Sequence, residues 1–234
     1  MATYLWLDLG ALLVPLLFTF HPKIRFDKEW RFYIPAILLS MMIYIVWDVW
    51  FTVSGVWGFN DAYLIGWDIL HLPVEEWLFF ICIPYACLFT HHCMGRLLPE
   101  MRLPQSTTAY INIGLILTWV VLTIIHYDRL YTLVNYTWAI IVTGIALRYH
   151  LESLSRFLTT YLVILAPFFL VNGILTGALY PEPIVWYDNT ENMGKRFLMP
   201  LEDYTYAYTM LLVPIMLVDR FKRRSRFDSI EKKA

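Results

Sequence analysis

Long apolar runs alternate with short polar segments along most of the chain, and this pattern predicts a polytopic membrane protein. An α-helix needs about 17–25 predominantly apolar residues to cross the hydrocarbon core of a bilayer. The sequence therefore predicts an all-α fold with seven transmembrane helices. Their expected positions are roughly 4–20, 32–52, 73–92, 109–126, 130–147, 157–179 and 201–219.

The composition agrees with this pattern, since 59% of the residues are hydrophobic and only 16% are charged. These values exclude an ordinary soluble domain. The first apolar run, Tyr4–Phe20, has no basic segment before it and no small-residue cleavage site after it, so we expect a retained span rather than a signal peptide. Cys82, Cys87 and Cys93 lie in or just beyond one run, and no Cys/His spacing resembles a zinc site. We therefore expect neither a disulfide framework nor a metal.

The basic residues are concentrated on one side of the predicted bundle. Fifteen of the 18 Lys and Arg residues lie in four segments that seven spans would place on the same side, namely 20–31, 93–108, 148–156 and 220–233. Cytoplasmic segments carry such an excess of positive charge. We therefore expect the N-terminus outside, the C-terminus in the cytoplasm, and a multi-pass protein of the plasma (inner) membrane.

A proline followed by two adjacent acids begins the third apolar run, in the segment Leu72–Trp77 (LPVEEW). The same arrangement returns 127 residues later in Met199–Tyr204 (MPLEDY). Charged groups next to hydrocarbon are costly and are read as functional by default. Two such pairs at matching positions predict one site built from two parts. The candidate catalytic residues are Glu75, Glu76, Glu202 and Asp203.

A second pair of polar positions extends this correspondence. Asp48 lies near the end of the second span and Asn172 near the end of the sixth, each four residues before a threonine. Spans 1–3 and 5–7 have the same orientation, which predicts a parallel repeat joined by the fourth span. The expected division is 1–108 for the first repeat, 109–129 for the connecting span, 130–221 for the second repeat and 222–234 for a basic cytoplasmic tail.

The position of the paired acids allows two explanations. A carboxylate near a helix N-terminus is favoured by the helix macrodipole, which would make these acids helix caps. Adjacent helical residues point about 100° apart, so one member of each pair is expected to face the bundle while its neighbour caps the helix. Glu75 and Glu76 both head apolar faces of their helix, so the sequence does not choose between them.

Other residues near the outer end of the bundle are predicted to support the acids. Asp48 is an isolated acid about one turn inside its span, which suggests that it faces the cavity, whereas Asn172 could instead bond a neighbouring helix. Arg196 would hold one carboxylate of the second pair ionised as a base. Aromatic rings facing the acids would stabilise a carbocation through their π faces, although interfacial belts also explain such residues. The aromatic candidates are Trp47, Trp50, Trp77, Phe80, Tyr204 and Tyr206.

Several classes of membrane protein are disfavoured by what the sequence lacks. It contains no G-x-G-x-x-G segment, so no dinucleotide-binding fold is indicated. It contains no aspartate-rich repeat to hold magnesium and diphosphate, which weakens the hypothesis of a prenyl transferase. The seventh span has no lysine for a Schiff base, which rejects a retinal-binding rhodopsin.

The motifs around the acids resemble those of the integral-membrane lycopene β-cyclases, which occur as two small subunits or as one fused chain. Phe59-Asn60, Tyr63-Leu64-x-Gly66, Leu72–Phe80 and Ile83-Pro84 resemble the first half of that family. Pro183–Tyr187, Gly194-x-Arg196 and Pro200–Asp203 resemble its second half. The resemblance covers most of residues 32–219 and implies that the linear ψ ends of lycopene are cyclised to β-rings without net redox change or a cofactor.

The resemblance also implies a mechanism, in which a carboxylic acid protonates the end double bond and a base removes a proton after ring closure. We expect Glu76 and either Glu202 or Asp203 to face the cavity, Glu75 and Arg196 to tune them, and Asp48 to relay protons. The expected partners are lycopene, related linear carotenoids and the lipid bilayer, with no nucleic acid. The alternatives are a carotenoid-binding or transport protein, or a hydratase or prenyl transferase acting on a carotenoid end.

Overall fold

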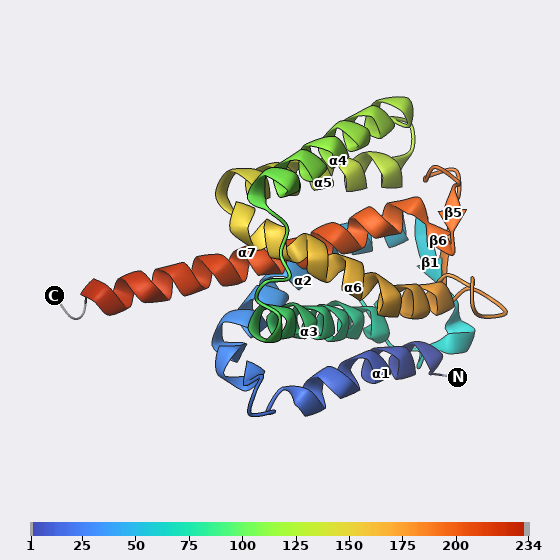
Figure 1. The fold of residues 1–234 in the computed structure, drawn as a ribbon. Coiled ribbons are helices and arrows are strands. Elements are labelled where there is room, and N and C mark those ends of the chain that lie inside the picture. The colour runs from blue at the N-terminus through green and yellow to red at the C-terminus, as the bar shows by residue number, and fades with distance from the viewer. Residues whose placement is uncertain (1, 232–234) are drawn as a thin grey trace.

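The computed structural model describes the backbone of residues 2–231 and the side chains of residues 2–226, and the chain is mostly helical. Successive α-helices run in opposite directions, so the helices form one bundle with two ends (Figure 1). The α-helices of the described chain are α1 (Thr3–Phe18), α2 (Trp30–Val53), α3 (Val74–Leu97), α4 (Gln105–Ile125), α5 (Leu130–Tyr149), α6 (Leu151–Leu175) and α7 (Leu201–Glu231).

Five helical segments of the described chain are long and apolar enough to cross a membrane, which confirms the prediction of a membrane protein with several spans. They are Phe26–Val53, which adds the short 3-10 helix η1 (Phe26–Glu29) to α2, and helices α3, α4, α5 and α6. Helix α1 is apolar but has only 16 residues, which gives a length of about 24 Å at 1.5 Å per residue. Helix α7 begins with two acids in its first turn and continues into a basic segment. The count of seven spans stays a prediction, and residues 232–234 of the predicted basic tail lie outside the described chain.

The predicted limits of the sixth span, 157–179, are shifted from those of α6, which begins at Leu151 and ends at Leu175. His150 alone separates α5 from α6. The first turns of α6 are polar, so hydropathy does not detect them although their backbone is helical. Apolar length indicates where a chain meets hydrocarbon, whereas helix limits depend on backbone hydrogen bonds.

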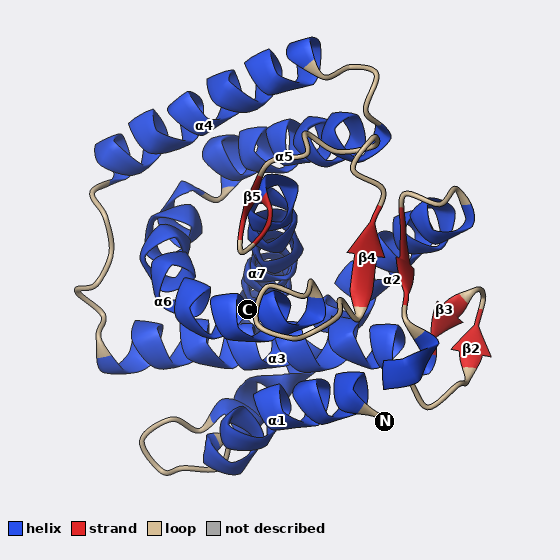
Figure 2. Ribbon diagram, turned by 90° about the vertical axis from the view of Figure 1, so that its right-hand side faces the viewer, coloured by secondary structure: helices blue, strands red, loops and turns tan. Residues whose placement is uncertain are grey.

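Three two-stranded antiparallel sheets cover the end of the bundle where the paired acids lie, and the all-α prediction missed them. Strand β1 (Trp57–Phe59) pairs with β4 (Val185–Tyr187), β2 (Asp68–Ile69) with β3 (Leu72–Pro73), and β5 (Arg196–Phe197) with β6 (Met199–Pro200) (Figures 1 and 2). Strands of two or three residues are too short to leave a period-two pattern in the sequence. Pro73 and Pro200 end their strands directly before α3 and α7, instead of lying in the first helical turn.

The helices pack around α3 and α7, which both start at the covered end. Helix α1 packs against α3, whereas α2 and α5 pack against α7. Helix α4 lies at the edge of the bundle against α5 and α6 (Figure 2). A hydrogen bond of 2.6 Å from the Tyr208 hydroxyl to the Asn112 side chain joins α4 to α7.

The β1–β4 pair joins two loops that are far apart in the sequence. Gly58 is paired with Trp186, and the pairing is extended by backbone bonds from Asn60 N to Ile184 O and from Asp188 N to Val56 O, both 2.9 Å. A Cβ atom at Gly58 would lie 2.3 Å from Cζ2 of the Trp186 ring. Glycine at position 58 therefore permits the indole to lie directly on the strand.

We expect the substitution Gly58→Ala to destabilise the protein, because the added methyl group overlaps the Trp186 ring and overpacking costs typically about 1–3 kcal/mol. Thermal unfolding of the purified protein measures the effect. The control is Gly58→Ala combined with Trp186→Ala, which removes the overlap and should recover stability relative to Trp186→Ala alone. An unchanged unfolding temperature for Gly58→Ala would show that the indole moves away without cost.

Candidate active site at the acid-lined end of the bundle

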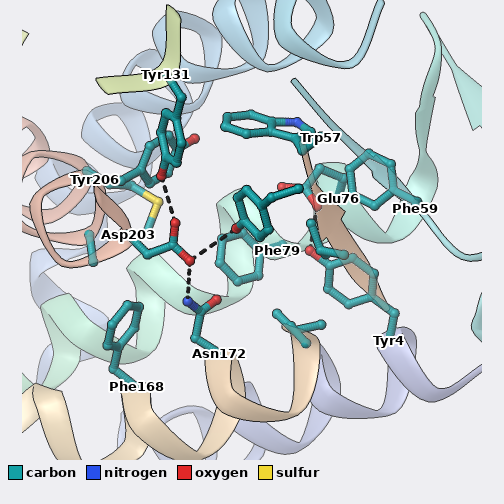
Figure 3. A pocket seen from close by; sticks show the side chains of 15 residues that line it. Tyr4, Trp57, Phe59, Glu76, Phe79, Tyr131, Phe168, Asn172, Asp203 and Tyr206 are labelled. Atoms are coloured by element: carbon teal, nitrogen blue, oxygen red, sulfur yellow. Dashed lines mark hydrogen bonds between the residues drawn. The ribbon is translucent and has the colours of Figure 1, made fainter. Parts of the chain in front are cut away.

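The second acid of each pair reaches a small cavity under the β1–β4 strands. Glu76 on α3 and Asp203 on α7 are 7% and 4% exposed, and both line a space of about 60 Å³ (Figure 3). The remaining walls are mostly aromatic. They are formed by Tyr4, Trp57, Phe59, Phe79, Tyr131, Phe168, Asn172, Leu175, Val185, Tyr187, Tyr206, Ala207 and Met210.

Asp203 accepts hydrogen bonds from three side chains on three different elements. The Tyr131 hydroxyl donates to Oδ1 at 2.8 Å, Asn172 Nδ2 donates to Oδ2 at 2.9 Å, and the Tyr187 hydroxyl donates to Oδ2 at 3.1 Å (Figure 3). Burial, reinforced by the adjacent Asp203, raises the pKa of Tyr187, so its hydroxyl keeps its proton and acts as a donor. Three donors directed at one carboxyl group stabilise its negative charge.

Glu76 has a different environment, because another carboxyl group faces it. The Tyr4 hydroxyl donates to Oε2 at 2.5 Å, and the carboxyl groups of Glu76 and Asp48 interact directly. Asp48 is 1% exposed and accepts a hydrogen bond of 2.8 Å from Trp57 Nε1. Two carboxyl groups in contact attract each other only if at least one is protonated. This contact therefore favours a shared proton on the Glu76 side of the cavity.

The first acid of each pair holds a loop. Glu75 Oε1 accepts a hydrogen bond of 2.7 Å from Ile65 N. Glu202 Oε1 accepts hydrogen bonds of 2.7 Å from Met193 N and from Thr132 Oγ1. Both glutamates are completely buried, so their carboxyl groups substitute for solvent at backbone N–H groups of the covering loops. Neither residue lines the cavity.

Asp8 on α1 is a further buried acid that the sequence analysis gave no role. It is 0% exposed and lies near Glu75 and Glu76, and neither of its oxygens has a hydrogen-bond partner among the described residues. An unpartnered buried carboxylate is costly, so the neutral acid is the favoured form. Its place one turn beyond Tyr4 in an apolar helix was itself the signal that could have found it.

A comparison with known protein families identifies the chain. The family model described as lycopene cyclase matches residues 1–94 and 128–221, which together make up most of the chain. The chain belongs to the lycopene cyclase family. This confirms the resemblance inferred from the motifs, and each of the two matched segments contains one of the acid pairs. Searches among curated proteins and among solved structures gave no match.

Some residues predicted to serve this family's chemistry lie at the cavity, and others do not. Tyr206 and Asn172 line the cavity with Glu76 and Asp203, and Asp48 lies directly behind Glu76. Trp47 and Phe80 are buried in the aromatic core outside the cavity wall, and Trp50 is 48% exposed on the outer surface of α2. The predicted carbocation-facing position of these three rings is therefore not what the structure shows.

Trp77 and Tyr204 hold the two small hairpins. The indole N–H of Trp77 donates to Ile69 O at 3.1 Å, and the hydroxyl of Tyr204 donates to Phe197 O at 2.5 Å. Arg196 lies with its guanidinium 5.8 Å from the centre of the Tyr187 ring and forms no ion pair with an acid within residues 2–226. It therefore reaches Asp203 only through Tyr187, instead of contacting a carboxylate as the sequence suggested.

The sequence analysis missed most of the groups that contact the two cavity acids. Tyr4 and Tyr131 bond Glu76 and Asp203, respectively, and the two tyrosines are 127 residues apart, as are the two acids. The same spacing was already known for the proline–acid segments, so extending it to the helices before them could have found both tyrosines. Trp57, Phe79, Phe168 and Tyr187 left no comparable signal.

We expect Glu202→Ala to lower stability by about 1–3 kcal/mol, because Met193 N and Thr132 Oγ1 would be left buried without an acceptor. Glu202→Gln keeps an acceptor oxygen at the same place and should cost much less. Thermal unfolding of both purified variants in detergent measures the difference. If the two variants lose equal stability, the negative charge of Glu202 matters more than its hydrogen bonds.

Proposed function

We propose that the protein converts the linear ψ ends of lycopene to β-rings by proton transfer from Glu76 and to Asp203. The observation that carries this proposal is the pair of buried carboxyl groups on one aromatic cavity, in a chain of the lycopene cyclase family. One carboxyl group faces another acid, and the other accepts three hydrogen bonds. Opposed environments of this kind make an acid and a base from two similar side chains.

In the proposed reaction, Glu76 donates its proton to C2 of the end group, and a carbocation forms at C1. The electron pair of the C5–C6 double bond then forms the C1–C6 bond and leaves the positive charge at C5. Asp203 removes the proton from C6, which creates the ring double bond. One proton is added and one is lost, so the product is an isomer of the substrate and no electron acceptor is needed.

The neighbours of the two acids support this division of roles. Asp8 and Asp48 surround Glu76, whereas the corresponding places near Asp203 are occupied by Asn135 and Asn172. Asn172 donates to Asp203, and Asn135 Nδ2 donates to the backbone oxygen of Glu202 at 2.7 Å. Acids on one side supply and store protons, and amides on the other side stabilise a carboxylate. We propose that Asp48 returns a proton to Glu76 after each turnover.

The aromatic cavity wall suits a carbocation between the two acids. Trp57 is at the centre of this wall, with ring centres 5.2 Å from Tyr131, 6.0 Å from Tyr187 and 6.3 Å from Tyr206. Electron-rich ring faces attract a cation, and more strongly where water is excluded. The small volume also leaves little room for water, which would otherwise capture the cation as an alcohol.

We further propose that two related halves build this site in a seven-span bundle, with the acid-lined end outside and the C-terminus in the cytoplasm. The two segments matched by the family model are each 94 residues long and begin 127 residues apart. The same spacing relates Tyr4–Glu76 to Tyr131–Asp203 and Trp77 to Tyr204. Residues 109–129 would then join the halves, and the excess of basic residues at the opposite end favours this orientation.

We expect Glu76→Gln and Asp203→Asn each to lower the rate of cyclisation by at least about 100-fold, because each keeps the shape but removes the titratable proton. The rate is measured as β-ring formation by purified protein in lipid vesicles that contain lycopene. Glu202→Gln is the matched control, since it makes the same change one residue away from Asp203 and outside the cavity. Near-normal rates for both cavity variants would refute the acid–base assignment.

Deuterium labelling tests the direction of proton transfer. In D₂O the carboxyl group of Glu76 exchanges with solvent, so each new ring should carry one deuterium at C2, while the hydrogen lost comes from C6. Mass spectrometry should therefore show a gain of one mass unit per ring. A hydratase would instead add the mass of water, and a protein that only binds carotenoids would leave the pigment unchanged. Rings without deuterium at C2 would contradict a solvent-exchangeable donor.

A further inference from the structure

A larger apolar groove continues directly from the acid-lined cavity. It has a volume of about 500 Å³, within the range of about 300–1,000 Å³ that is typical of small-molecule sites. Helices α1, α3, α6 and α7 form its walls. The groove and the cavity share the lining residues Phe79, Phe168, Asn172, Ala207 and Met210, so a molecule in the groove can place one end at Glu76 and Asp203.

The lining of the groove suits a hydrocarbon that has no polar groups. None of its lining residues is charged, and Asn172 and Thr90 provide its only polar side chains apart from the indole of Trp6. Trp6 on α1 and Leu170 on α6 stand at its rim with 70% and 58% of their surface exposed. Both helices face lipid at this place, so the groove opens toward the hydrocarbon of the bilayer. A phospholipid would find no charged partner for its headgroup inside the groove.

Small residues on α1 make the groove possible. Gly10 and Ala11 line it, and a Cβ atom at Gly10 would meet nothing within 4 Å. The residue 127 positions after Ala11, on α5, is Trp138. Its ring centre lies 6.3 Å from that of Trp47, and its Nε1 donates to the Tyr44 hydroxyl at 3.0 Å. Tyr44 is completely buried, so the corresponding approach to the acids is filled by side chains.

We propose that the groove between α1 and α6 holds the polyene chain of a linear carotenoid, which enters from the lipid and presents one end group to the acids. This inference rests on the proposed function and adds the route and the orientation of the substrate. A conjugated polyene is too stiff to fold back, so its two ends cannot reach one cavity together. Because Trp138 and Tyr44 fill the other approach, the molecule must leave and return reversed before its second end reacts.

The first test blocks the groove. Ala11→Trp places in α1 the side chain that already fills the other half, and Ala86→Phe narrows the groove from α3. Each should reduce the lycopene retained by the protein after purification by at least about tenfold, because the added ring takes the place of the polyene. Leu13→Trp is the matched control, since Leu13 is 56% exposed on the same helix and does not line the groove.

Binding is measured in the Glu76→Gln background by visible absorption, and thermal unfolding shows that each variant is folded. Unchanged lycopene binding by either folded groove variant would overturn the proposal. Binding that depends on the groove, in a protein that never forms rings, would refute the proposed function while leaving the groove assignment intact.

The second test follows release of the intermediate from the protein with an intact active site. Protein loaded with ¹³C-lycopene is mixed with a large excess of unlabelled lycopene at the start of the reaction. We expect the first labelled product to carry one ring and to remain so while the unlabelled substrate is in excess. Labelled two-ring product formed at once, without a one-ring intermediate, would contradict a single groove used by one end at a time.

Discussion

Buried carboxyl groups without water are the constraint on which the rest of this structure depends. An unpaired charge in an apolar interior is costly, so each acid at this end of the bundle needs a partner from another part of the chain. Glu76 and Asp203 find theirs in Tyr4 and Tyr131, at the start of α1 and α5. These bonds link helices that are more than 70 residues apart, so satisfying the acids also sets how α1 packs on α3 and α5 on α7.

The division of labour within each acid pair follows from helix geometry. Neighbouring residues on a helix point in different directions, so one acid of a pair can bond the covering loop while the other faces the cavity. Glu202 holds the backbone at Met193, and its neighbour Asp203 is bonded by Tyr187 from the strand above it. The β1–β4 strands that exclude water from the cavity are therefore attached to the acids that we propose do the chemistry.

The proposed reaction needs a difference between two similar halves. Identical halves would bring together two equal carboxyl groups, whereas isomerisation through a carbocation needs one proton donor and one acceptor. Asp48 beside Glu76 and Asn172 beside Asp203 provide that difference in charge. Ala11 and Trp138 provide a second difference in space, since one half leaves a groove for hydrocarbon and the other fills it.

The sequence by itself determined the membrane class, the two proline–acid segments and the family. These features are written in apolar length and in spacing along the chain, which survive without any knowledge of contacts. The 127-residue spacing even contained the two tyrosine partners, although only the acids drew attention to it. The short strands were invisible because two or three residues carry no periodicity.

Only the tertiary structure decided which acid of each pair faces the cavity, because Glu75 and Glu76 both head apolar faces and differ solely in what meets them. It also placed Arg196 on Tyr187 instead of on a carboxylate, and it placed Trp47 in the core instead of on the cavity wall. Such contacts join residues that are distant in sequence, and local pattern contains no information about them. Whether a space between helices stays open depends in the same way on the volumes of side chains from several elements, which only packing brings together.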